Sequence, residues 1–142
     1  MTRPHATQIP QCSRPVVVDW GRLSYRSALA RQRAAAADRR AGRCGDLIVR
    51  VEHPPTITLG RHAPSDDLLL DERVLARRGI DVVRSDRGGR ATYHGPGQVV
   101  VYPIVAIGDL GLGVRAWVEL LEQALLETLR AFAIDGHLVA GR

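Results

Sequence analysis

The residues most able to do chemistry lie in one segment, residues 85–98, which reads SDRGGRATYHGPGQ. Gly88 and Gly89 let a ligand approach the backbone closely because they carry no Cβ, and their N–H groups can donate to a carbonyl or a phosphate. Arg87 and Arg90 flank this pair with fixed positive charge. The pattern predicts a site for a ligand that carries hydrogen-bond acceptors.

A rigid turn closes the same segment. In the sequence Gly95-Pro96-Gly97, proline presets one backbone dihedral and glycine accepts the next. Tyr93 and His94 stand immediately before this turn, so we expect their side chains to be held in a defined direction. The alternative interpretation is a long surface loop with turn glycines, and the density of functional residue types favours the ligand site.

Other chemistries are disfavoured by what the sequence lacks. The segment has no G-x-G-x-x-G pattern followed by a helix, which a dinucleotide site needs. All 20 basic residues are arginine, so these 142 residues contain no phosphate-loop lysine, Schiff-base lysine or lysine-assisted nucleophile. Cys12 and Cys44 are too few and too far apart for a metal quartet or a disulfide scaffold, and we interpret both as loop residues rather than nucleophiles.

The remaining histidines are weaker candidates. His53, beside two prolines, and His62, after Gly60-Arg61, have the chemistry of ligands or bases, but we interpret both as ordinary loop histidines. The rigid turn makes His94 the stronger candidate, for a hydrogen bond to substrate or to its own loop rather than for proton transfer.

The elements that must position this segment alternate between strands and helices. Hydrophobic patterning predicts strands over residues 16–20, 46–52, 56–59, 80–84 and 99–105, with a further strand beginning at 137–139. It predicts helices over residues 24–40, 71–78 and 114–133, the last with Trp117 and a leucine stripe in the core. Pro54-Pro55 must separate two strands, and residues 86–98 are expected to form a loop. The order predicts an α/β (α+β) fold, one mixed sheet with packed helices.

Composition and charge narrow the class of protein. The length allows one ordinary domain, and no apolar run approaches the roughly 20 residues of a membrane-spanning helix. A net charge of +5 favours a solvated cationic surface or acidic protein partners, while scattered arginines and 4% aromatics disfavour nucleic acid. Residues 1–15 are expected to be a flexible tail rather than a secretory signal, which with sparse cysteines predicts a cytoplasmic protein.

A resemblance to a known family runs through these motifs. RGGRATYHGPGQ at residues 87–98 resembles the signature of the lipoyl(octanoyl) transferases, the octanoyltransferases of lipoate biosynthesis. The likeness extends through WGRLSY (20–25), EHPPTITLGR (52–61), RGI (78–80) and GLGVR (111–115). It implies a fold like the catalytic domain of biotin and lipoate protein ligases, with residues 16–142 as the N-terminal part of that domain, truncated at the C-terminus.

The resemblance also implies an activity. Octanoyl-acyl carrier protein would be the donor, and a lysine of the lipoyl domains of 2-oxoacid dehydrogenases and of the glycine cleavage system the acceptor, through a cysteine thioester. Both kinds of partner are acidic in the family, and neither a cofactor, a metal nor a membrane is expected. By analogy with the family, the pocket for the octanoyl group would be lined by eight consecutive residues: Arg87, Gly88, Gly89, Arg90, Ala91, Thr92, Tyr93 and His94.

The family's catalytic pair, a cysteine with a neighbouring lysine, follows the helix that ends near Ala133. Neither Cys12 nor Cys44 matches that position, so we expect no catalytic residue in this chain and negligible turnover by it alone. The alternatives are a catalytically dead module that binds an acyl group or a carrier protein, a lipoate ligase-like acyltransferase, and an arginine-rich nucleic-acid binder. Residues 95–98 favour the transferase over the ligase, whose ATP-binding elements are not found.

Overall fold

The computed structural model describes residues 14–139, which form two compact units, residues 14–105 and residues 106–139. The first unit holds two sheets, each of three strands, in the orders β1-β2-β6 and β4-β3-β5. Each sheet contains one parallel and one antiparallel pair, so the predicted mixed α/β class is confirmed. The expected tail falls mostly on residues 1–13, which lie outside the described residues.

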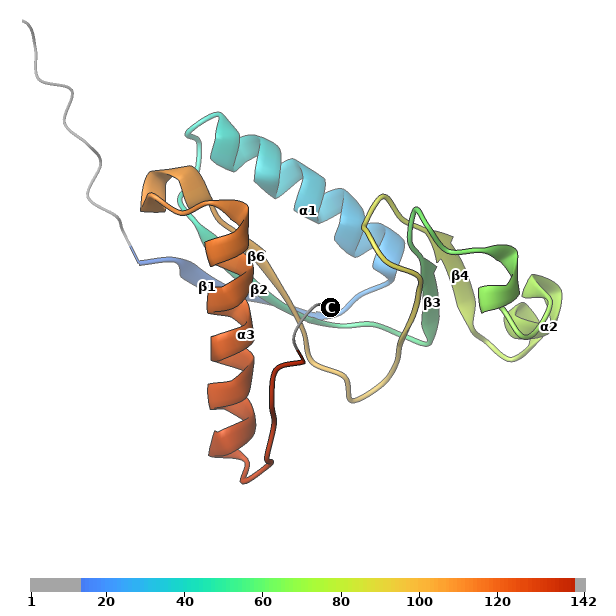
Figure 1. The fold of residues 1–142 in the computed structure, drawn as a ribbon. Helices are drawn as coiled ribbons and strands as arrows, with labels where there is room; N and C mark the ends of the chain where they lie inside the picture. Colours follow the sequence, from blue (N-terminus) through green and yellow to red (C-terminus); the bar gives the residue numbers. More distant parts are fainter. Residues whose placement is uncertain (1–13, 140–142) are drawn as a thin grey trace, which may run out of the picture. The chain divides into compact units, whose positions relative to one another are not determined.

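The first sheet is centred on β2 (Leu47–Glu52), with β1 (Val16–Arg22) parallel to it and β6 (Val100–Ile104) antiparallel (Figure 1). The register places Val18 beside Val49 and Val49 beside Tyr102. Residues paired across a sheet share a face, so these three side chains lie on the same side. Val49 and Val51 are almost completely buried and form the centre of this small core.

The parallel connection from β1 to β2 runs through α1 (Tyr25–Arg40). Ser24 begins the helix as predicted, because its hydroxyl accepts a hydrogen bond from the N–H of Ser27 at 3.2 Å. Ala28 is buried, and α1 contacts β6. The helix thereby brings Tyr25, its first residue, into the interior of the unit.

The second sheet is centred on β3 (Thr56–Leu59), with β4 (Asp81–Arg84) parallel and β5 (Ala91–His94) antiparallel. The short helix α2 (Glu72–Arg77) connects β3 to β4, after the 3-10 turn η1 (Ser65–Asp67). Asp71 caps α2, and Gly79 has the positive φ of 73° that a helix stop requires. Both ends of α2 agree with the sequence prediction to within a residue.

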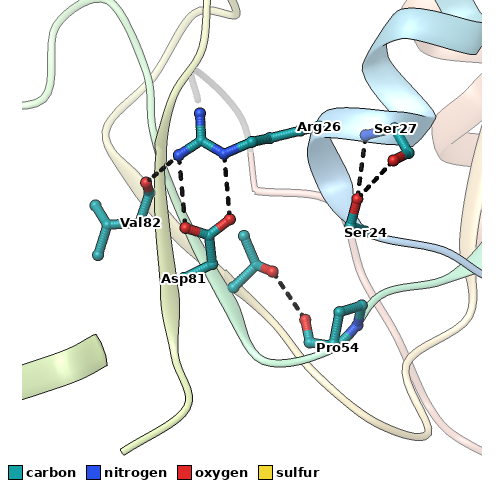
Figure 2. A network of polar contacts seen from close by, with 7 residues as sticks. Ser24, Arg26, Ser27, Pro54, Asp81 and Val82 are labelled. Carbon is teal, nitrogen blue, oxygen red and sulfur yellow. Dashed lines mark hydrogen bonds and ion pairs between the residues drawn. The ribbon is translucent and has the colours of Figure 1, made fainter. Parts of the chain in front are cut away.

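Arg26 ties α1 to the free edge of the second sheet (Figure 2). Its guanidinium donates to the carbonyl of Val82 at 3.0 Å and lies 3.4 Å from the carboxylate of Asp81. The N–H of Asp81 donates to the carbonyl of Pro55, immediately before β3, so the carbonyl of Val82, one residue on, points away from β3. Arg26 therefore satisfies an acceptor that an edge strand otherwise leaves exposed.

The second unit consists of the 3-10 turn η2 (Ile107–Leu110) and α3 (Val114–Ala131). The helix is where the periodicity predicts it, but none of its residues is fully buried, and Trp117 is only half-buried. The burial of Trp117 and the leucine stripe stays a prediction, because the described residues of the second unit contain no other apolar layer. A single amphipathic helix cannot bury its own apolar stripe, because burial needs a second apolar layer.

Three predictions are corrected. There are two sheets instead of one, because Pro54-Pro55 separates β2 from β3 and the two strands join different partners. The expected loop over residues 86–98 contains β5, which pairs with β3. Residues 137–139 form no strand, since nothing in the described residues pairs with them. None of the helices between residues 14 and 139 is both long and apolar enough to cross a bilayer.

Candidate functional site

The glycine loop, defined here as residues 85–90, connects β4 to β5 and is held by its carbonyl groups. The carbonyl of Arg87 accepts from the N–H of Arg61 at 3.0 Å, and that of Arg90 from the N–H of Gly60 at 3.2 Å. Within residues 14–139, the N–H groups of Gly88 and Gly89 have no hydrogen-bond partner. The loop therefore uses its acceptors internally and leaves these two donors unpartnered in this part of the chain, and a ligand for them stays a prediction.

Glycine is required where this loop meets the end of β3. A Cβ on Gly60 would lie 2.3 Å from the carbonyl oxygen of Gly89 and 2.9 Å from that of Gly88. Gly89 itself has a φ of 80°, which side chains rarely adopt. The close approach of two backbones thus sets the path of the loop.

Arg87 places its guanidinium over Thr58 in β3. One terminal nitrogen donates to both the carbonyl oxygen and the hydroxyl of Thr58, each at 2.8 Å, and the other donates to the carbonyl of Gly88 at 2.9 Å. No carboxylate among the described residues forms an ion pair with Arg87. Nε also donates to the hydroxyl of Thr58, at 3.3 Å, so the guanidinium is held in place by hydrogen bonds while its charge is compensated by no carboxylate of the described residues.

Arg90 is engaged differently. It forms an ion pair with Asp67 of η1, and the second oxygen of that carboxylate accepts from the N–H of Ala91 at 3.1 Å. The hydrogen bond from Arg90 holds the pKa of the Asp67 carboxyl below its ordinary value, against the opposing effect of desolvation. The contact with Asp67 anchors the start of β5, and it compensates the charge of Arg90 within the protein.

His94, at the end of β5, is packed among aromatic rings. Its imidazole stacks on Tyr25 with ring centroids 5.7 Å apart and meets the ring of His53 at 5.6 Å and 78°. Nδ1 donates to the side-chain oxygen of Gln98 at 3.0 Å, while Nε2 lies 3.5 Å from the hydroxyl of Thr58. Burial lowers the pKa of His94, and nearby His53 and Arg87 lower it further, against the opposing hydrogen bond to Gln98.

His53 lies at the centre of this group and is completely buried. Nδ1 is 2.7 Å from the carbonyl oxygen of Leu23, and Nε2 is 2.8 Å from the hydroxyl of Tyr102. Burial, with a smaller effect of Tyr25, raises the pKa of Tyr102 to about 12. The interpretation of His53 as an ordinary loop histidine is therefore wrong, whereas His62 is exposed, as expected of one.

The residues predicted to line one pocket do not share one surface. The register pairs His94 with Thr56 and Thr92 with Thr58, so these four side chains lie on one face of the second sheet. This is the face on which the ring of His94 meets the rings of Tyr25 and His53. Ala91 and Tyr93 alternate to the opposite face. Gly88, Gly89 and Arg87 lie in the loop beside Thr58, and Arg90 is turned to Asp67.

Several residues of the site were not singled out from the sequence, namely Tyr25, Thr58, Ser85 and Tyr102. The hydroxyl of Tyr25 lies 3.2 Å from that of Ser85, which joins α1 to the glycine loop. One signal was available, because Thr56 and Thr58 alternate within a strand, and polar residues at this period predict a polar face. The other residues come from distant segments, so no local pattern identifies them.

The described residues contain no second candidate site for catalysis or metal binding. No group of three histidine, cysteine or acidic side chains is placed to hold a metal ion in this part of the chain. Cys44 is half-buried, with its sulfur 3.9 Å from the carbonyl of Ala35, and Cys12 lies outside the described residues. A cavity of about 450 Å³ is lined by Arg26, Ala76 and Asp81, away from the glycine loop.

Comparison with known proteins agrees with this architecture. Residues 24–140 match the family model described as the lipoyl protein ligase A/B catalytic domain. The chain belongs to this family. The matched range contains the glycine loop, His53, His94 and Tyr102.

Curated relatives give the same family by sequence. An octanoyltransferase of Chloroflexus aurantiacus is 45% identical over 121 residues, 85% of this chain and 54% of the relative. One of Alkaliphilus metalliredigens is 45% identical over 113 residues, 80% of this chain and 52% of the relative. The chain spans about half the length of these curated relatives.

Solved structures support the fold. The bi-partite lipoate protein ligase of Thermoplasma acidophilum matches with a TM-score of 0.59 at 13% identity, over 89% of this chain and 48% of that one. A lipoate-protein ligase A bound with ATP matches with a TM-score of 0.54 at 14% identity, over 87% of this chain and 50% of that one. The expected likeness to the lipoate ligase catalytic domain is thus confirmed.

Proposed function

We propose that this chain carries the acyl-binding part of an octanoyltransferase of lipoate biosynthesis. The reaction moves an octanoyl group from acyl carrier protein to a lysine of a lipoyl domain through a cysteine thioester. The observation that carries the proposal is the set of donors on the glycine loop, formed by the N–H groups of Gly88 and Gly89 and the guanidinium of Arg87. Octanoyltransferase relatives 45% identical to the chain support it.

These donors suit the carbonyl oxygen of an octanoyl thioester. When a thiolate attacks the carbonyl carbon, negative charge develops on this oxygen, and donors already in place stabilise it. The carbon–sulfur bond to the carrier then breaks and releases the carrier thiolate. The lysine amine attacks the new thioester, the cysteine leaves as a thiolate, and the amine gives up its proton to solvent. The contribution we assign to Arg87, Gly88 and Gly89 is to hold the acyl carbonyl during both steps.

The proposal assigns no nucleophile within these 142 residues. The sequence contains no lysine, and Cys12 and Cys44 both precede the glycine loop. The sulfur of Cys44 is directed to the carbonyl of Ala35. We therefore propose that the chain by itself binds the donor without appreciable turnover.

The proposed partners are two kinds of acidic protein. The donor is octanoyl-acyl carrier protein, and the acceptors are the lipoyl domains of 2-oxoacid dehydrogenases and of the glycine cleavage system. The net charge of +5 favours encounter with both through electrostatic steering. Cytoplasmic location is part of the same proposal, since these partners act there.

Binding is tested by titrating the ¹⁵N-labelled chain with octanoyl-acyl carrier protein, with the unacylated carrier as control. We expect the amide signals of Gly88 and Gly89 and the side-chain Nε–H of Arg87 to shift only with the acylated carrier. Shifts confined to other segments would contradict the assignment of the loop. A transfer assay to a lipoyl domain should give negligible product, and a normal enzymatic rate would refute the assignment of the nucleophile outside this chain.

A further inference from the structure

We infer that His53 is a positioning residue that holds His94 with its Nε2 toward Thr58 and the guanidinium of Arg87. The inference rests on the proposed function, which gives this orientation of His94 its use. A ligand held by the donors of the glycine loop lies beside an imidazole nitrogen that can only accept a hydrogen bond. His53 acts through His94, without contacting the ligand.

The surroundings of His53 determine which of its nitrogens carries the proton. The carbonyl oxygen of Leu23 can only accept, so Nδ1 at 2.7 Å must donate to it. In the neutral ring Nε2 is then an acceptor, and the hydroxyl of Tyr102 at 2.8 Å donates to it. Rotation of this completely buried ring would leave two buried polar groups unpaired, so its orientation is fixed.

His53 connects segments that are distant in sequence. Leu23 follows β1, His53 follows β2 and Tyr102 lies in β6, so its two hydrogen bonds join three parts of the first sheet. Its ring also meets His94 of the second sheet at 5.6 Å and 78°. His53 therefore relates the position of β5 to that of the first sheet.

The ring of His94 is confined by three contacts. Tyr25 stacks on it at 5.7 Å with 23° between the ring planes. His53 contacts it edge to face, with 78° between the planes, and Gln98 accepts a hydrogen bond from its Nδ1 at 3.0 Å. Tyr25 and His53 also contact each other at 5.5 Å. With Nδ1 donating to Gln98, Nε2 is an acceptor that lies 3.5 Å from the hydroxyl oxygen of Thr58. That oxygen accepts from Arg87, and the hydroxyl donates to the carbonyl of Thr92 at 3.4 Å.

The test reads the tautomer of His94 from ring ¹⁵N chemical shifts of the ligand-free chain. The wild-type chain is expected to show the Nδ1–H form. His53→Asn retains a donor near Leu23 but removes the acceptor for Tyr102 and the ring that meets His94. With His94 no longer held against Gln98, we expect its ratio of Nδ1–H to Nε2–H to fall about fivefold, as loss of the one hydrogen bond from Nδ1 to Gln98 would give. His53→Gln, with an amide oxygen near the position of Nε2, should retain most of the ratio.

The control is His62→Gln at an exposed histidine, which should leave His94 unchanged. An unaltered His94 tautomer and unaltered Tyr25–His94 ring contacts in folded His53→Asn would overturn the inference. If His53→Asn does not fold, Tyr102→Phe is the deciding variant, because it removes only the hydroxyl that orients His53. An unchanged tautomer ratio of His94 in Tyr102→Phe would also overturn the inference. The readout needs no octanoyl ligand, so it is separate from failure of the proposed function.

Discussion

Gly60 lies against the carbonyl oxygen of Gly89 so closely that a Cβ on Gly60 would come within 2.3 Å of it. Two glycines separated in sequence thus allow the end of β3 and the glycine loop to approach each other. The hydrogen bond from the N–H of Gly60 to Arg90 at 3.2 Å holds the same contact. The position of the loop's donors depends on this approach.

Gly60→Ala should displace the loop, because the methyl group meets backbone rather than a flexible side chain. We expect a loss of about 1–3 kcal/mol in the free energy of unfolding, measured in urea, together with loss of binding to octanoyl-acyl carrier protein. Gly88→Ala is the matched control within the loop, since nothing lies within 4 Å of a Cβ there. That variant should fold with normal stability, and equal destabilisation of the two would contradict the role of the close contact.

Arg87→Ala should weaken binding of octanoyl-acyl carrier protein about 10- to 100-fold, the effect of losing a charge-assisted hydrogen bond. Gly89→Val should abolish binding, because the loop needs the positive φ at this position. The control is Arg84→Ala, an exposed arginine on β4. Affinity retained in Arg87→Ala, measured by fluorescence titration, would show that the acyl carbonyl binds elsewhere.

The Asp67–Arg90 pair should make the order of the loop sensitive to acid. Because the pKa of Asp67 is lowered in the folded protein, its stabilising effect is complete above the unfolded value of about 3.9. It is lost as the pH falls through the lower, folded value. The protection factor of the Ala91 amide, taken relative to intrinsic exchange at each pH, should therefore fall at acid pH in the wild type and be low at every pH in Asp67→Asn. High protection in Asp67→Asn would mean that the carboxylate does not anchor β5.

His94 should titrate below the ordinary histidine pKa of about 6.5, chiefly because burial disfavours its charged form. Between the folded and unfolded pKa values the unfolded chain binds more protons. The stabilising contribution of neutral His94 is therefore present above 6.5 and decreases as the pH falls toward the folded value. NMR titration of the ring carbons measures the midpoint, and His94→Gln should lose this part of the pH dependence of unfolding. A midpoint above 6.5 would contradict the burial of the ring.

Elements set by local interactions could be predicted from sequence. Ser24 caps α1 and Gly79 ends α2 because these roles need only neighbouring backbone groups. Pro54-Pro55 interrupts the ladder for an equally local reason. The strand β5 was not predicted, because its glycine- and proline-rich surroundings indicate a loop and its partner β3 lies more than 30 residues away.

The sequence by itself determined the donor-rich loop, the helix ends and the family, since a short run of residues carries each of these. Only the tertiary structure decided that Tyr25, His53 and Tyr102 gather around His94, and that Arg90 is neutralised by Asp67 while Arg87 is not. These contacts join residues that are 23 to 69 positions apart, from Arg90 with Asp67 to Tyr25 with His94. Such pairings depend on how crossover connections bring strands together, and no local pattern of residue types encodes that.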